Sequence, residues 1–288
     1  MIKKNIINPL WSAIQWFDSI SLEDLNNSMA LMERKETKFL LSLEQLPQLI
    51  SCLQEKFSVL TIKDTNIFNY DNVYLDTQDY KFYHQHEWWK KIRTKVRTRQ
   101  YVDSNIQFFE YKQRNKWQIS KYRYELSAEE HWKITLEWMK FFQKIYTWIY
   151  NTPLQQLIVP SLKNSYNRIT FCSKNNDERI TIDYNLQFTD PVNPTNTYLL
   201  KNIAIIESKA ATQPAPSASI FKALNIKKHG ACSKYCLWLI HLNKVDTYNH
   251  FQKTLDSIQS LQTQNIGSEK KSVETIHEAV QEFSHNVS

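Results

Sequence analysis

Four basic side chains occupy alternate positions in one short segment, residues 91–101. They are Arg93, Lys95, Arg97 and Arg99, and each residue between them is threonine or valine. A β-strand places every second side chain on the same face, so a strand here carries four positive charges on one face. Like charges that are close together on a sheet destabilise it unless an anion lies against them. The segment therefore indicates that the protein binds a phosphate-rich ligand.

The glycine content restricts how phosphate could be bound. The chain has 288 residues but only two glycines, Gly230 and Gly267. A glycine-rich phosphate loop of the Walker or dinucleotide-binding type cannot be built without several glycines. Any phosphate site must therefore use side chains. Arginine would supply paired donors to phosphate oxygens and lysine would supply point charges.

The positive charge is concentrated in one region of the sequence. The formal net charge is +7, and residues 90–123 contain eleven basic residues but only two acidic ones, Asp103 and Glu110. The rest of the chain is therefore slightly acidic. A local basic region of this kind indicates a polyanionic partner and not a generally basic surface.

The same alternation of charged and apolar residues recurs in most of the other predicted strands. A solvated outer face explains any single strand of this type. The repetition of arginine and lysine, with one carboxylate in most strands, favours a sheet whose charged face turns inward around a cationic tunnel. Carboxylate oxygens inside such a tunnel are suitable ligands for Mn²⁺ or Mg²⁺. The candidate metal ligands are Glu207, Glu36, Glu110 and Asp183.

Antiparallel strands must position these side chains. Strands are predicted at 33–42, 72–77, 91–101, 106–114, 119–127, 165–173, 178–188 and 202–210. Helices are predicted at 43–57, 128–150, 218–227, 233–242 and 268–283. Hairpins interrupted by a few helices indicate an α+β fold with a closed or nearly closed sheet. We expect a helical lead-in at 1–30, a tunnel domain at 31–243 and a polar helical tail at 244–288.

The sequence contains no signal for a membrane or for export. No apolar run approaches the roughly 18 residues that a membrane span needs, and the N-terminus has no signal-peptide pattern. A cytoplasmic location is the expectation.

An ordered series of segments carries a family resemblance. It runs ERKETKF, YLDT, YHQH, KIRTKVRTRQY, FFEYKQR, SKYRYE, SYNRITF, ERITIDYNLQF, IIESK and SKYC. Over residues 32–242 the chain resembles the VTC domain, the polyphosphate polymerase branch of the triphosphate tunnel metalloenzyme (CYTH-like) superfamily. The resemblance implies a closed tunnel of eight antiparallel strands flanked by helices. It also implies metal-dependent transfer of the γ-phosphate of ATP to a polyphosphate chain.

The resemblance also implies roles for individual residues. Glu207 matches the metal-binding glutamate of the family, Glu36 lies in an E-x-K pattern and His86 in a Y-x-x-H stretch. At a commonly basic family position the chain has Ala231, for which Lys227 or Lys228 could substitute. The predicted catalytic residues are Lys38, Arg97, Arg99, Lys112, Arg168, Arg179 and Glu207. The predicted phosphate-binding residues are Lys38, Arg93, Lys95, Arg97, Arg99, Lys112, Lys121, Arg168, Arg179, Lys209, Lys234 and His86.

Three functions remain open at this point. The first is the polyphosphate polymerase, with ATP, tripolyphosphate or polyphosphate as ligands. The second is a tripolyphosphatase or nucleoside triphosphatase, in which Glu36 or Glu110 would orient water. The third is a non-enzymatic binder of polyphosphate or of single-stranded nucleic acid, for which exposed aromatics would stack on bases. Those aromatics are Trp88, Trp89, Tyr101 and Trp117, and we expect them to pack against flanking helices instead.

Two further expectations bear on these alternatives. A nucleic-acid groove has no need for Glu110 and Glu207 on the basic face, so binding to DNA is not expected. His84 and His86 have strand spacing but no third ligand nearby, so they are interpreted as polar strand residues and not as a metal pair.

Overall fold

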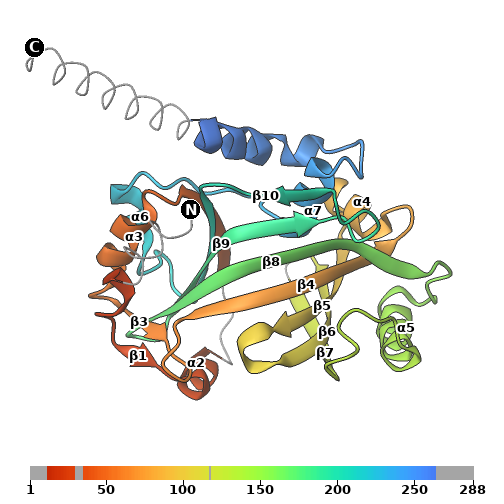
Figure 1. Ribbon diagram of the computed structural model, residues 1–288, viewed down its shortest axis with the longest axis horizontal. Helices are drawn as coiled ribbons and strands as arrows, with labels where there is room; N and C mark the ends of the chain where they lie inside the picture. The colour runs from red at the N-terminus through yellow and green to blue at the C-terminus, as the bar shows by residue number, and fades with distance from the viewer. Residues whose placement is uncertain (1–11, 30–34, 117, 264–288) are drawn as a thin grey trace, which may run out of the picture.

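The structure is a computed structural model that describes residues 12–29, 35–116 and 118–263. These residues form one large sheet with helices around it (Figure 1). Eight strands follow one another in the order β2-β11-β9-β8-β4-β5-β6-β7, and each neighbouring pair is antiparallel. Their bounds are β2 (Lys35–Ser42), β4 (Ile67–Thr77), β5 (Ile92–Tyr101), β6 (Ile106–Asn115), β7 (Gln118–Leu126), β8 (Ile158–Ser173), β9 (Glu178–Thr189) and β11 (Ile203–Ala210).

Three shorter strands extend the sheet to eleven strands. β3 (Phe57–Leu60) pairs with β8 and, in parallel, with β1 (Ser19–Ile20), while β10 (Thr197–Leu199) pairs with β9. The N-terminal lead-in is thus joined to the sheet. Ile14 and Phe17 also pack in the core beneath α3 (Leu46–Leu53).

The prediction of a closed tunnel of eight strands is wrong in one respect, because the sheet is open. β2 and β7 end the path, and no ladder joins them in the described part of the chain. The free edge of β2 is occupied by another segment, because the backbone N–H of His229 donates to the carbonyl of Lys38 at 2.8 Å. Lys228 also bridges Phe39 there. The middle of this edge of β2 therefore pairs with the 228–229 segment and not with β7.

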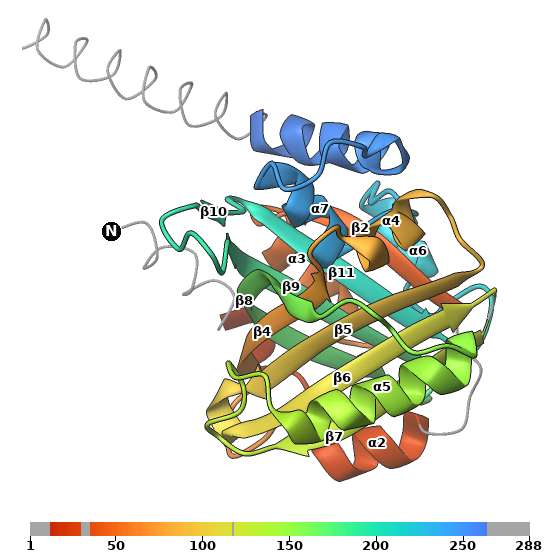
Figure 2. The ribbon, with the colours of Figure 1, turned by 90° about the vertical axis from the view of Figure 1, so that its right-hand side faces the viewer.

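The remaining helices cover both sides of the curved sheet. α5 (Leu136–Tyr150) lies along the outer side of β6 and β7 (Figure 2), where Trp138 and Phe142 pack on Phe109. α7 (Lys234–His241) packs inside the curve, and its Trp238 stacks on Phe188 at 3.8 Å between ring centroids. The shorter helices are α2 (Leu22–Met29), α4 (Lys81–Glu87), α6 (Ala218–Ala223), η1 (Val102–Ser104) and η2 (Asn249–Phe251), and residues 252–263 are helical.

The inner face of several strands is divided into two halves. On β2 the residues of the concave face are Glu36 and Lys38 at one end and Leu40 at the other. On β11 they are Glu207 at the charged end and Ile205 at the apolar end. The apolar halves pack in one core with α7. On the charged halves, the side chains of Glu36, Lys38 and Glu207 remain about a quarter exposed. The division along each strand therefore determines which part of the concave face can receive a polar ligand.

Two predicted elements differ from the structure in type or length. His84 and His86 lie in α4 and not in a strand, because side chains at the end of β4 accept the first amides of that helix. The carboxylate of Asp76 accepts the N–H groups of Phe82 and Tyr83, which an N-terminal helical turn leaves without partners. The helix predicted at 128–150 begins only at Leu136, after a series of turns.

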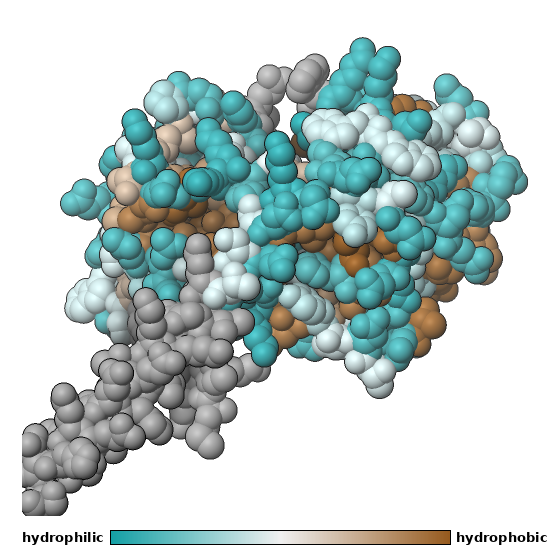
Figure 3. All heavy atoms as spheres, turned by 90° about the horizontal axis from the view of Figure 1, so that it is seen from above, coloured by the Kyte–Doolittle hydropathy of each residue, from teal (hydrophilic) through white to brown (hydrophobic). Residues whose placement is uncertain are grey.

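Other predicted elements change only in their bounds or cannot be described. α3 and α6 are shorter than the predicted helices, and β4 and β8 begin earlier than the predicted strands. The helix expected at 268–283 and Trp117 lie outside the described residues. No helix in the described ranges is long and apolar enough to cross a membrane. Viewed from above, hydrophilic side chains cover most of the visible face, with apolar atoms between them (Figure 3).

Candidate functional site

The four alternating cations of β5 all lie on the concave side of the sheet. Thr94, Val96 and Thr98 point to the outer side, where each is at most 2% exposed. Thr94 is held by the hydroxyl of Tyr150 from α5, and Thr98 donates to the carbonyl of His131. The buried outer side fixes the register of β5, and so it fixes the cationic face as well.

Glu110 of β6 is the centre of the first charge cluster. One of its oxygens lies 2.6 Å from Nη2 of Arg97, and the other lies 2.7 Å from Nζ of Lys121 and 3.0 Å from Nε of Arg123. The side chain is only 2% exposed. Burial alone would raise the pKa of Glu110, but Arg97, Arg99 and Lys121 lower it well below its usual range. Glu110 is therefore an ionised counter-charge that holds β5, β6 and β7 together.

Asp183 of β9 forms a second, smaller cluster. Arg168 of β8 donates to both of its oxygens at 2.6 and 2.7 Å, and Nζ of Lys234 from α7 lies 2.6 Å away. Although burial raises the pKa of Asp183, Arg168 and Lys234 keep it below its ordinary value. This ion triad attaches the start of α7 to the sheet.

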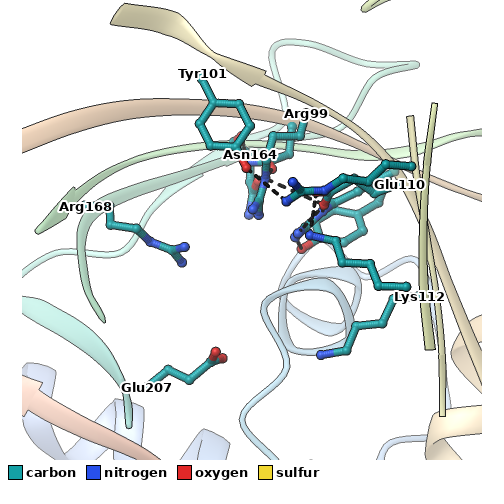
Figure 4. Close-up of polar contacts among 12 residues, drawn as sticks. Arg99, Tyr101, Glu110, Lys112, Asn164, Arg168 and Glu207 are labelled. Atoms are coloured by element: carbon teal, nitrogen blue, oxygen red, sulfur yellow. Dashed lines mark hydrogen bonds and ion pairs between the residues drawn. The ribbon is translucent and has the colours of Figure 1, made fainter. Parts of the chain in front are cut away.

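A third cluster lies where the two ends of the sheet approach each other. Lys38 of β2 lies 2.7 Å from Glu36 and 3.4 Å from Glu207 of β11, and Lys209 lies 2.9 Å from Glu207. Lys112 of β6 reaches Glu36 at 3.6 Å. Figure 4 shows Lys112, Arg168 and Glu207 pointing from different strands toward one central space. Side chains thus connect the two parts of the sheet that no ladder joins.

Three cations of the same face have no carboxylate partner among the described residues. They are Arg93, Lys95 and Arg179, and none of them forms an ion pair there. The Nε atoms of Arg93 and Arg179 are buried without a hydrogen-bond partner in the described chain. Burial lowers the pKa of Lys95 to about 8, and among the described residues its ammonium donates to Ser233 at 2.9 Å. Positive charge that is partly buried and has no carboxylate partner favours an anionic ligand.

Tyrosines and asparagines support the cations, and the sequence analysis did not single out most of them. Tyr70 and Tyr166 stack at 5.2 Å, and Arg168 lies over both rings. Arg99 lies 5.2 Å from the Tyr70 ring and donates to the buried amide oxygen of Asn72 at 2.8 Å. Their alternation in the sequence could have identified them, because Tyr70, Asn72 and Tyr74 occupy every second position of one strand, as the cations do.

Asn164 is a further residue that the sequence analysis missed. It lies on β8 and is 2% exposed, and neither polar atom of its side chain has a partner among the described residues (Figure 4). A buried amide without partners in this part of the sheet is a candidate ligand contact.

The remaining predicted residues lie at the margins of the site. His86 is on α4, with its Nε2 3.3 Å from the carbonyl of Thr94, and burial with Lys95 nearby keeps its pKa well below the usual value. It is therefore neutral. Lys227 and Lys228 are exposed. Trp88 and Trp89 are 59% and 63% exposed, so they are not buried against helices as expected.

The residues that fit a divalent metal best are Glu36 and Glu207. Both side chains are about a quarter exposed, at 22% and 24%. Lys38 overcomes the effect of burial and holds the pKa of Glu36 at about 2, and the pKa of Glu207 is well below normal for the same reasons. Two ionised carboxylates fit Mg²⁺ or Mn²⁺ when phosphate and water complete the coordination. No group of three acidic, histidine or cysteine side chains in the described ranges has metal-binding geometry.

The remaining two carboxylates fit a metal less well. Glu110 and Asp183 are each 2% exposed and already accept hydrogen bonds from surrounding cations. A metal would have to displace these cations before it could reach the oxygens. As the residues stand, both serve to neutralise charge.

Comparison with known proteins identifies the family. Residues 33–242 match the VTC domain, and the chain therefore belongs to the VTC domain family. No curated protein matches the chain.

Several solved structures resemble the fold. The bh2851 protein of Bacillus halodurans, described as an adenylate cyclase candidate, is 16% identical, with 70% of this chain and 95% of that chain covered and a TM-score of 0.45. The PH1819 protein of Pyrococcus horikoshii is 13% identical, with 73% of this chain and 99% of that chain covered and a TM-score of 0.40. The PH1012 protein of the same organism is 12% identical, with 68% of this chain and 92% of that chain covered and a TM-score of 0.37.

Proposed function

We propose that this protein is a polyphosphate polymerase, which transfers the terminal phosphoryl group of ATP to the end of a polyphosphate chain. The observation that carries the proposal is a set of partly buried cations, Arg93, Lys95 and Arg179, that form no ion pair with a carboxylate in the described chain. They line the same concave face as cations that are already neutralised. A linear polyanion such as a triphosphate or a phosphate chain would supply the missing negative charge at several points.

The state of the carboxylates favours transfer to phosphate over transfer to water. Hydrolysis requires a group that accepts a proton from the attacking water. Glu110 and Asp183 are sealed by cations, and the pKa of Glu36 is held at about 2, so all three are weak bases. The terminal phosphate of a chain is ionised near neutral pH and needs no base. The polymerase reaction therefore requires less of this site than hydrolysis does.

The reaction would proceed by in-line displacement. An oxygen of the chain's terminal phosphate attacks the γ-phosphorus of ATP, and a new P–O bond forms. The bond between the γ-phosphorus and the bridging oxygen breaks, and the electron pair leaves with ADP. Catalysis of such a transfer consists mainly of positioning and charge stabilisation. Arg97, Arg99 and Lys38 would hold the nucleotide phosphates, while Arg168 and Arg179 would hold the chain.

A divalent metal would be held by Glu207 with Glu36. When bound, it would neutralise negative charge on the phosphoryl oxygens. The residues of the chain determine the rest: Lys38 keeps both carboxylates ionised, and Lys112 and Lys209 lie beside them. This proposal places the metal at the junction of β2, β11 and β6.

A triphosphatase is the second candidate, and one observation favours it. Glu36 and Glu207 face the central space and are partly exposed, so either could orient a water molecule. A non-enzymatic binder of single-stranded nucleic acid is less well supported. A nucleic-acid groove has no need for Glu110 and Glu207 on the basic face, whereas metal-dependent phosphoryl transfer gives Glu207 a role.

The test incubates the purified full chain with ATP and Mn²⁺ or Mg²⁺ and separates the products by gel electrophoresis. Polyphosphate chains together with ADP would support the polymerase. Orthophosphate without chains would identify the triphosphatase. No turnover of ATP or tripolyphosphate with either metal would contradict both. The Arg179→Ala variant, which removes a cation without a carboxylate partner, is the matched control for contamination because it should lose the activity.

A further inference from the structure

A second basic pocket lies on the outer side of β5, away from the concave face. It is a cavity of about 690 Å³ between α4, the beginning of β5 and the end of α5. Gln85 and Tyr150 line it, and both bond to Thr94, which points away from the cationic face. The body of the sheet therefore separates this pocket from the candidate active site. Its volume lies within the roughly 300–1,000 Å³ that is typical of sites for small ligands.

Three lysines and one carboxylate line the pocket, so its net charge is positive. Lys81, Lys90 and Lys91 all line it, and none forms an ion pair with a carboxylate in the described chain. The one acidic residue of the lining, Asp79, accepts hydrogen bonds from Thr77 and Gln156 instead. The pocket therefore favours an anionic ligand.

An aromatic surface lies beside these lysines. Trp88 is 59% exposed, and the ring of His84 stacks on it at 4.8 Å with an interplanar angle of 20°. Nζ of Lys90 lies 5.7 Å from the centre of the Trp88 ring. Nδ1 of His84 is buried and has no hydrogen-bond partner among the described residues. A large exposed indole suits stacking of a planar heterocycle.

We propose that this pocket binds a nucleoside monophosphate or diphosphate. The base would stack on Trp88, and the phosphate would lie among Lys81, Lys90 and Lys91. The proposal does not rest on the polymerase reaction, because the pocket shares no lining residue with the concave face. Gln85 and Tyr150 connect the pocket to Thr94, whose chain neighbours are Arg93 and Lys95. A nucleotide bound here would therefore contact the strand that carries the cationic face.

The test measures binding of AMP to the full chain by isothermal titration calorimetry, with tripolyphosphate as the probe for the concave face. Stacking and one phosphate contact predict that Trp88→Ala and Lys91→Glu each weaken AMP binding at least about tenfold. Both variants should leave tripolyphosphate binding within about twofold of the parent. Lys91→Arg should retain AMP binding. The control Arg179→Ala should show the reverse pattern, with weak tripolyphosphate binding and unchanged AMP binding.

Three results would overturn the proposal. One is a parent protein that does not bind AMP at millimolar concentration. Another is AMP affinity that is the same in Trp88→Ala and Lys91→Glu as in the parent. The third is inorganic phosphate that binds as tightly as AMP, because the base would then contribute nothing. Both altered side chains are exposed, and thermal unfolding of each variant checks that the fold is retained.

Discussion

Nζ of Lys112 lies 3.6 Å from a carboxylate oxygen of Glu36, although the two residues are on strands far apart in the sheet order. The sheet curves until the concave face of β6 lies across from that of β2, and this ion pair spans the space between them, whereas closure would need a ladder between β2 and β7. Lys112→Gln should change stability by less than about 1 kcal/mol, since the lysine is 40% exposed. Tripolyphosphate affinity should fall about tenfold with the loss of one phosphate contact. Thermal unfolding and calorimetry measure the two effects, and a large loss of stability would show that the pair holds the sheet.

Arg97 has two roles that mutation can separate. Arg97→Ala should destabilise the protein by about 1–3 kcal/mol, because Glu110 keeps Lys121 and Arg123 but loses its closest partner. It should also weaken tripolyphosphate binding by at least about 100-fold. The double variant Arg97→Ala/Glu110→Gln should recover neither stability nor binding, because Lys121 and Arg123 then lose their shared counter-charge. If Arg97→Ala binds as tightly as the parent, Arg97 does not face the ligand.

Glu207 is predicted to act in turnover and not in binding. Glu207→Gln removes one carboxylate from the proposed metal site but leaves the phosphate-binding cations in place. We expect tripolyphosphate binding without metal to remain within about threefold of the parent, while turnover with Mg²⁺ or Mn²⁺ falls at least about 100-fold. Glu125→Gln on exposed β7 is the matched control. Full activity of Glu207→Gln would exclude this residue as a metal ligand.

Lys95 should make binding depend on pH. Burial lowers its pKa to about 8, so in the free protein the ammonium loses its proton as the pH rises through 8. A bound polyanion favours the protonated form, so tripolyphosphate affinity should be highest below pH 8 and fall above it. Lys95→Arg should remain charged at pH 9 and keep more of its affinity there.

The comparison between variants removes the titration of the ligand itself, because that is the same for each protein. The exposed Lys140→Arg serves as the control and should behave as the parent does. Lys95→Arg should reduce the pH dependence of tripolyphosphate affinity only in part, since burial also lowers the pKa of Lys112 to about 8 and that of Lys121 to about 7. Parallel pH profiles for Lys95→Arg and the parent would contradict the assignment.

Tyr235 is predicted to position α7. Its hydroxyl donates to Asp76, which also accepts three backbone amides and whose pKa burial raises to about 6. Tyr235→Phe should cost about 1–3 kcal/mol of stability. It should also weaken tripolyphosphate binding a few-fold, because the neighbouring residues Ser233 and Lys234 contact Lys95 and Asp183. The hydroxyl of Tyr83 donates to a neutral backbone carbonyl, so Tyr83→Phe is the control and should affect stability alone.

The sequence predicted the eight main antiparallel strands from alternating residue types, but β4 and β8 begin earlier than expected and the short strands β1, β3 and β10 were not predicted. β5 is the clearest case: threonine and valine on one side and four cations on the other allow only one orientation once the apolar side is buried. The position of α4 was missed because its helix start depends on Asp76, whose carboxylate reaches amides six and seven residues later. Such a contact has no local pattern.

The amino-acid sequence alone determined the cationic strand faces, the absence of a glycine-rich phosphate loop and the resemblance to the VTC domain. These follow from residue type and from a period of two, which are local properties. The tertiary structure decided that the sheet stays open at β2. It also decided which cations are neutralised by Glu110 and Asp183 and which lack a partner in the described chain. Charge compensation depends on distances of a few ångströms between strands remote in sequence, and only the folded chain sets those distances.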